Sequence, residues 1–262
     1  MKKIFLTLLL FSNIFAQANR LLMLSPSAHT SSIGNVMLPM MSPARNHLDL
    51  DKISFSRVNW LGNIVGDMNY MHINLAKGSF DFNTLIFNYG EQLETDISGV
   101  VTGKFSPMSS IWGVSWGGNI KGYNVGVTAK VIQHDLYVQK TFGTAFDVAT
   151  YLPKVYKDLD VDIALRNFGV APTFGSFKTK LPTSLNVALT YPYKQWMFYE
   201  QHNLMKKNIT SGFGVSYKYE VKDQGVIFCK IGYFVDTMHD LTYPTFGVDL
   251  KYDKYFIGMS YI

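Results

Sequence analysis

The sequence predicts an all-β protein, specifically a transmembrane antiparallel up-and-down β-barrel, on three observations. Hydrophobic residues recur with a period of two along most of the chain, which is the pattern of strands that have one apolar face. Aromatic residues make up 15% of the chain and charged residues only 16%. Beyond residue 18, no apolar stretch approaches the length of a membrane-spanning helix, so such a chain would cross a bilayer with strands.

Residues 1–18 have the pattern of a cleavable export signal. Lys2 and Lys3 form a basic start, residues 4–11 form a short apolar run, and residues 16–18 (Ala-Gln-Ala) supply a small-x-small cleavage site. The apolar run is shorter than the roughly 20 residues that a spanning helix needs. The sequence therefore predicts that the chain is exported.

The alternation is clearest in residues 123–131. There the odd-numbered positions are apolar, and the even-numbered positions are Asn124, Gly126, Thr128 and Lys130. A soluble β-sandwich would alternate in the same way. However, these segments are about 9–11 residues long, which is the length that crosses a bilayer when tilted, and tyrosines recur at their ends, as at a bilayer interface. The pattern therefore favours a membrane barrel in the outer membrane of a bacterium.

The predicted barrel occupies residues 51–262 and has about 14 strands, an even number as in bacterial single-chain barrels. Twelve strands are predicted instead if the pair around residues 90–108 does not form. Short connections alternate with longer ones, which indicates a meander. The predicted strands lie near residues 53–60, 67–75, 79–89, 100–106, 110–118, 122–134, 142–151, 158–167, 183–192, 195–204, 211–221, 225–234, 244–252 and 255–262.

Residues 19–50 do not alternate and are rich in Met and Pro, so they are predicted to form an irregular segment before the first strand. Two arrangements are open for this segment. It could fold into the lumen as a plug, or it could hang from the barrel as a loose periplasmic tail. The plug is favoured because an apolar tail left in water is costly.

Charged residues of both signs lie on the polar faces of the predicted strands and are expected to line the lumen. Opposite charges facing each other across a narrow barrel can pair and close it. The sequence therefore predicts a lumen that is closed to ions. The candidate lumen charges are Lys130, Asp147, Asp160, Asp162, Arg166, Lys218, Glu220, Lys230, Asp249 and Lys251.

Motifs for catalysis, cofactors or metals are missing from the sequence. Asp158, Asp160 and Asp162 match the start of a calcium loop, but Ile163 stands where that loop needs Gly and Gly169 where it needs Glu. There is no nucleophile elbow, zinc-protease motif or phosphate-binding glycine loop. The net charge of +5 is weak and scattered along the chain. We therefore expect no enzyme activity, no cofactor, no metal and no nucleic-acid partner.

Several short segments resemble the PorV/PorQ family of outer-membrane proteins, which is itself similar to the FadL-type fatty acid transporters. These segments are Ser-Pro-Ser-Ala at 25–28, Ser-Pro-Ala at 42–44, Ile-Ser-Phe-Ser at 53–56, Leu-Arg-Asn-Phe-Gly at 165–169 and Ile-Gly-Tyr at 231–233. The second segment departs from the family's Asn-Pro-Ala signature by having Ser in place of Asn. The order and spacing of the segments carry the resemblance.

The resemblance implies a 14-stranded FadL-like barrel without catalytic residues. It also implies a role in type IX secretion, in which PorV-like members carry cargo to surface attachment and PorQ-like members help to tether it. The compact loops resemble PorQ more than PorV. Besides outer-membrane lipid, the expected partner is therefore a protein of a secretion or surface-attachment machine. The alternative is a FadL-like passage for hydrophobic small molecules, which would need an apolar pocket inside the barrel.

Overall fold

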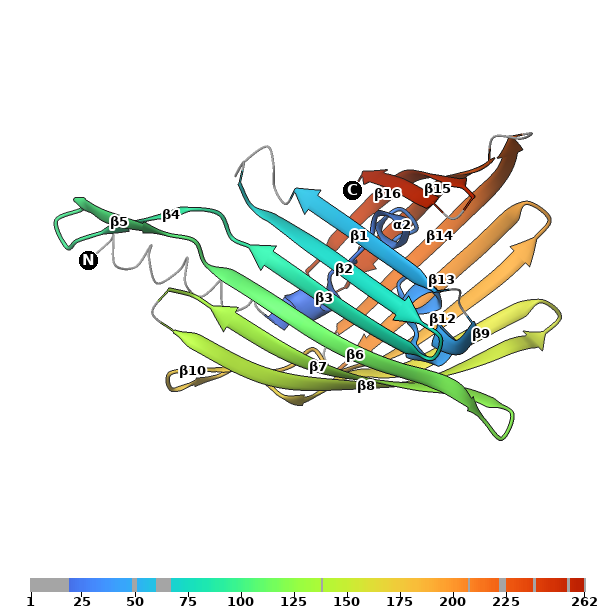
Figure 1. The fold of residues 1–262 in the computed structure, drawn as a ribbon, viewed down its shortest axis with the longest axis horizontal. Helices are drawn as coiled ribbons and strands as arrows, with labels where there is room; N and C mark the ends of the chain where they lie inside the picture. Colours follow the sequence, from blue (N-terminus) through green and yellow to red (C-terminus); the bar gives the residue numbers. More distant parts are fainter. Residues whose placement is uncertain are drawn as a thin grey trace.

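The computed structural model describes residues 19–48, 51–59, 67–137, 139–206, 208–221, 225–237, 239–253 and 255–261. The predicted export signal, residues 1–18, lies outside these ranges. Most of the described chain forms one curved antiparallel sheet of thirteen strands (Figure 1). Its strands are β1 (Lys52–Asn59), β2 (Asn69–Lys77), β3 (Phe80–Asn88), β6 (Met108–Ile120), β7 (Tyr123–Asp135), β8 (Lys140–Tyr156), β9 (Leu159–Val170), β12 (Ser184–Tyr193), β13 (Trp196–Met205), β14 (Asn208–Val221), β15 (Gly225–Asp236), β16 (Leu241–Tyr252) and β17 (Tyr255–Tyr261).

The all-β class and the antiparallel meander are confirmed, because the strands pair in the order in which they follow along the chain. The predicted strand count needs a correction. The strand predicted near residues 100–106 forms as β5 (Val101–Phe105), but it pairs with β4 (Gln92–Thr95) in a separate hairpin. The Tyr89 N–H donates to the Pro107 carbonyl at 3.1 Å, which closes the base of this hairpin. As a result β3 pairs directly with β6, and the main sheet has 13 strands rather than 14 or 12.

A second small hairpin, formed by β10 (Thr173–Phe174) and β11 (Phe177–Lys178), also stands apart from the sheet. The edges of the main sheet are β1 and β17. Among the described residues, no strand pairing joins these two edges. Because neighbouring strands are antiparallel and their number is odd, β1 and β17 run in the same direction.

The two faces of the sheet differ in the way that the alternation predicts. Along β7, Val127 and Val131 are 47% and 46% exposed on the outer face, whereas Thr128 and Lys130 are 5% and 8% exposed on the inner face. The outer face of β7 is therefore apolar and open, and most of its inner face is polar and covered. The inner face of the sheet also holds a buried apolar cluster, in which Tyr70, Phe87 and Ile132 pack against Leu21 and Leu22 of the N-terminal segment.

An N-terminal segment, residues 19–48, covers the inner face (Figure 1). It contains η1 (Asn19–Met23), α2 (Ala28–Ser31), α3 (Leu38–Met41) and η2 (Pro43–Leu48). The short helix α2 contacts β16 and β17, α3 contacts β9 and β12, and η2 contacts β6, β7 and β8. The segment therefore lies against strands from both halves of the sheet. No helix within the described ranges is long and apolar enough to span a membrane.

Candidate functional site

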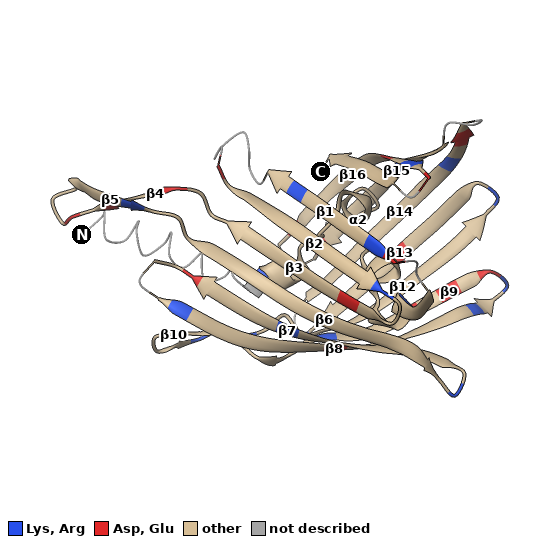
Figure 2. Ribbon diagram, in the orientation of Figure 1, with Lys and Arg blue, Asp and Glu red and all other residues tan. Residues whose placement is uncertain are grey.

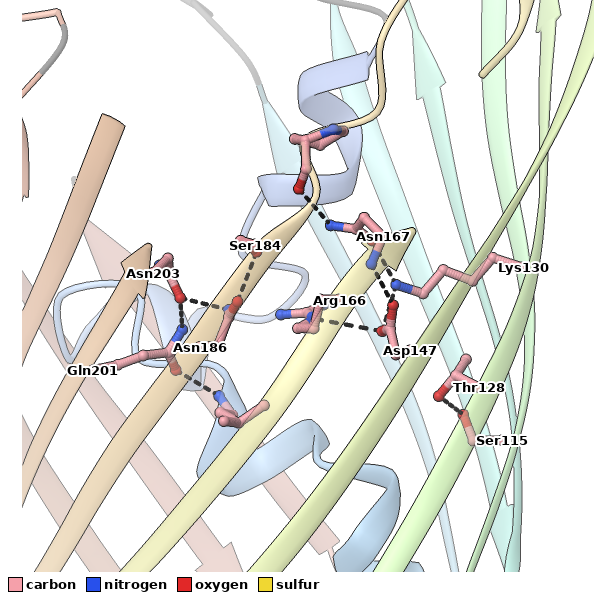
Figure 3. A network of polar contacts seen from close by, with 12 residues as sticks. Ser115, Thr128, Lys130, Asp147, Arg166, Asn167, Ser184, Asn186, Gln201 and Asn203 are labelled. Carbon is pink, nitrogen blue, oxygen red and sulfur yellow. Dashed lines mark hydrogen bonds and ion pairs between the residues drawn. The ribbon is translucent and has the colours of Figure 1, made fainter. Parts of the chain in front are cut away.

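The first cluster on the inner face surrounds Asp147 of β8 (Figure 3). Its carboxylate lies 2.6 Å from the Lys130 ammonium of β7 and 3.4 Å from the Arg166 Nε of β9. The backbone N–H of Asn167 donates to it at 2.8 Å, and Lys130 also donates to the Asn167 side chain at 2.8 Å. The buried Asp147 carboxylate is therefore paired with two cations and hydrogen-bonded, as burial of a charge in a low-dielectric interior requires.

A β-bulge makes this cluster possible. The pairing of β8 with β9 shifts register between Phe146 and Val148, so Asp147 has no direct partner in the ladder. Across from it, Asn167 has a positive φ of 57°, a conformation that Asn tolerates better than most residues. This backbone turn aims the Asn167 N–H at the Asp147 carboxylate. The bulge thus turns the Asn167 N–H away from the strand ladder and toward a side chain.

The second cluster ties the N-terminal segment to the sheet. Arg45 of η2 donates to both oxygens of the Asp162 carboxylate, at 3.1 Å from Nε and 2.6 Å from Nη2. Its guanidinium also lies 3.8 Å from the centre of the Tyr151 ring. Tyr151 in turn donates to Asp160 at 2.8 Å. Burial alone would lower the pKa of Arg45, but the hydrogen bond and the charge of Asp162 raise it.

The third cluster joins α2 to β15 and β16. Lys230 and Asp249 form an ion pair, and both side chains are fully buried. His29 of α2 lies 2.5 Å from the Asp249 carboxylate and 2.6 Å from the Lys230 ammonium. Burial, and to a lesser degree the charges of Lys230 and Lys52, lower the pKa of His29 to about 3. The imidazole is therefore neutral at pH 7.

A row of amide side chains completes the inner face (Figure 3). The Gln201 side-chain oxygen accepts from the backbone N–H groups of Met37 and Leu38, at 2.9 and 2.7 Å. Those groups belong to the start of α3, where main-chain donors have no partner within the helix. Gln201 also donates to Asn203, which accepts from Asn186 as well. Gln201 of the sheet thus caps the N-terminus of α3, which has no capping side chain of its own.

The main chain of the N-terminal segment packs closely against inward-facing glycines of the sheet. A Cβ at Gly126 of β7 would lie 2.3 Å from the Pro43 carbonyl carbon, and one at Gly212 of β14 would lie 2.1 Å from the Gly34 oxygen. These glycines therefore let two main chains approach closely. Glycines on alternate positions of one strand, such as Gly212 and Gly214, were the signal for this contact.

Seven of the ten candidate lumen charges belong to the three clusters. They pair with neighbouring strands and with the N-terminal segment, whereas the sequence led us to expect pairs that reach across the lumen. The other three lie at exposed strand ends. Lys218 and Glu220 pair with each other at 2.5 Å with 45% and 71% of their side chains exposed, and Lys251 is also exposed.

A small cavity lies between the N-terminal segment and the sheet. Its volume is about 30 Å³ and its lining includes Leu22, Met37, Arg166 and Asn186, so it has room for water and not for a larger ligand. Among the described residues, no group of three His, Cys, Asp or Glu side chains could hold a metal ion. The second and third clusters and the amide row hold the N-terminal segment against the sheet.

The fold and the site together define a class of protein: a curved antiparallel sheet with an apolar outer face, whose polar inner face is covered by its own N-terminal segment. Comparison with known protein families finds no matching model, and comparison with curated proteins finds no match.

Proposed function

We propose that this chain is a non-enzymatic protein of the bacterial outer membrane that crosses the bilayer as a β-barrel. The observation that carries the proposal is the polarity of the sheet, with an apolar outer face and a largely polar inner face that is buried. An apolar surface that extends over a whole sheet is costly in water and is typical of membrane or partner contact. Outer-membrane strands have this alternation, apolar toward lipid and polar toward the lumen.

We infer that the protein works through its rims, as a component of a type IX-like secretion or surface-attachment machine. The N-terminal segment occupies the interior of the sheet. The cavity of about 30 Å³ described above is too small for a hydrophobic ligand. The hairpin of β4 and β5 extends beyond the sheet (Figure 1), and charged residues lie on this hairpin and at several connections between strands (Figure 2). The resemblance to the PorV/PorQ family, closer to PorQ, favours the same role.

The filled interior leads to a conductance prediction. The intact protein in a planar bilayer is expected to show negligible single-channel conductance, because its charges are paired and its lumen is occupied. A variant lacking residues 19–48 is expected to conduct ions, since that deletion empties the lumen and removes Arg45 and His29, which contact Asp162 and Asp249. The contradicting result is a stable, porin-sized conductance from the intact protein.

The cellular role is tested by deleting the gene in the source bacterium. Deletion is expected to lower the amount of one or more exported proteins on the cell surface and to leave uptake of a labelled fatty acid unchanged. Reintroducing the intact gene should restore the surface proteins. Loss of fatty acid uptake with an intact surface proteome would instead support the FadL-like passage for hydrophobic small molecules.

A further inference from the structure

The two edges of the sheet are less covered than its middle. Ile53 and Phe55 of β1 are 83% and 64% exposed, and Met259 of β17 is 74% exposed, against 47% for Val127 in the middle of the sheet. Neither β1 nor β17 shows the buried inner positions that alternate along β7. We call the space between residues 53–58 and 256–261 the seam. Both of its borders have the exposure expected when one neighbouring strand is absent.

Strand direction limits how the seam can close. Every pair in the main sheet is antiparallel, but β1 and β17 run in the same direction, so joining them directly would create one parallel pair. In a bilayer, unpaired N–H and C=O groups at a strand edge are not tolerated, because lipid offers them no hydrogen bonds. One further strand, antiparallel to both borders, would satisfy the two edges and bring the total to an even number.

We propose that the seam is the docking site for an extended strand donated by a partner protein, which completes the barrel. This inference rests on the proposed membrane function and names how the partner binds. Strand addition to an open sheet edge is a known mode of peptide recognition, in which main-chain hydrogen bonds give affinity and alternate side chains give specificity.

The borders of the seam define the chemistry of the donated strand. Toward lipid, its side chains would lie between Phe55 on one side and Ile257 and Met259 on the other, so these should be apolar. Toward the interior, the middle of each border is a small residue, Ser56 of β1 and Gly258 of β17, which leaves room there for larger polar side chains. The partner segment is therefore an alternating apolar and polar strand of about the length of β1.

The inner side of the seam already has a support. The short helix α2 contacts β17, and its His29 ring lies 5.7 Å from the ring of Phe256. The helix thus lies beside the β17 border of the seam, where the donated strand would pack against it. A shallow hollow of about 470 Å³, lined by Phe246, Met259 and Tyr261 among others, adjoins the β17 border.

A second copy of this chain does not fit the seam. All copies insert into the membrane with the same orientation, so the β1 and β17 edges of a second copy run in the same direction as those of the first. Each contact between copies would therefore be parallel. A different polypeptide, free to enter in the opposite direction, is the occupant that the geometry favours.

Site-specific photo-crosslinking tests the proposal in cells that express the full chain. Phe55 and Met259 are each replaced by p-benzoylphenylalanine, with Val148 on the same outer face of β8 as the control. Both seam positions are expected to give an adduct of increased mass, and mass spectrometry should map both adducts to one alternating segment of one other protein. Probes at Ile53 and Arg57 should map along that segment in antiparallel order, and the Val148 probe should not reach it.

Direct closure is tested by pairs of cysteines placed in β1 and β17 of a Cys229→Ser variant. Directly paired strands allow a disulfide because their Cα atoms lie within about 7 Å, whereas an intervening strand separates them by about 10 Å. Disulfides formed at several registers in outer-membrane protein would overturn the proposal, as would crosslinks confined to copies of this chain. Recovery of the protein in the soluble periplasmic fraction would overturn the proposed membrane function itself. This result is distinct from the disulfides or self-crosslinks that would overturn only the strand-docking proposal.

Discussion

Replacing Val127 with arginine is expected to destabilise the folded protein in lipid by about 2–4 kcal/mol. Val127 lies near the middle of β7 on the outer face and is 47% exposed. In a bilayer this position faces acyl chains, where a guanidinium loses its hydration without gaining a partner. In water the same change at a half-exposed site would have little effect. Urea titration of unfolding in lipid vesicles measures the difference.

The matched control is arginine at Tyr123, on the same face of the same strand and 65% exposed at the strand end. Near a bilayer interface the expected cost falls to about 0–1 kcal/mol. Thr128 is unsuitable as a control, because its hydroxyl is buried and lies 2.9 Å from the Ser115 hydroxyl. Equal effects at Val127 and Tyr123 would contradict the membrane assignment of β7.

Replacing Arg45 with alanine is expected to cost about 3–5 kcal/mol, because it leaves a buried carboxylate without its partner. Asp162 is fully buried, and Arg45 makes a bidentate contact with it. The change should also release η2 from β9. Unfolding titrations in lipid give the loss in stability, and limited proteolysis should reveal new cleavage within residues 43–48.

Two further variants isolate the cause of this loss. The double change Arg45→Ala with Asp162→Ala is expected to be less destabilising than Arg45→Ala alone, because it also removes the orphaned charge. Lys104→Ala breaks an ion pair with Glu91 that is more than half exposed, and water screens such a pair, so stability should barely change. A double variant as unstable as the sum of its two single variants would show that Arg45 acts without Asp162.

Strand positions could be predicted from the sequence because alternation is a local property. Each of the predicted segments contains a strand, and Val127 and Lys130 point to opposite faces as expected. Strand pairing is different, because the alternation of residues 100–106 is the same in a side hairpin as in the main sheet. The pairing of β3 with β6 and the contact between Tyr89 and Pro107 separate the two arrangements, and no local pattern encodes them.

The charged site was predictable only in part for the same reason. Alternation indicated that Asp147, Asp162 and Asp249 point inward, since it fixes the face of a strand. The partners depend on register and on where the N-terminal segment runs, so the contacts of Arg45 and His29 could not be foreseen. The bulge beside Asp147 also leaves no recognisable mark in the sequence.

The route of the N-terminal segment has a consequence for the order of folding. His29 contacts Asp249, which lies 220 residues later in the chain, so this contact must wait until the last strands have been delivered. Contacts between such distant residues slow folding, because the loop between them must be ordered before the contact forms. The earliest residues must also be inside before the strands wrap around them. Whatever assembles this protein therefore has to keep the sheet open around its own N-terminus until β16 arrives.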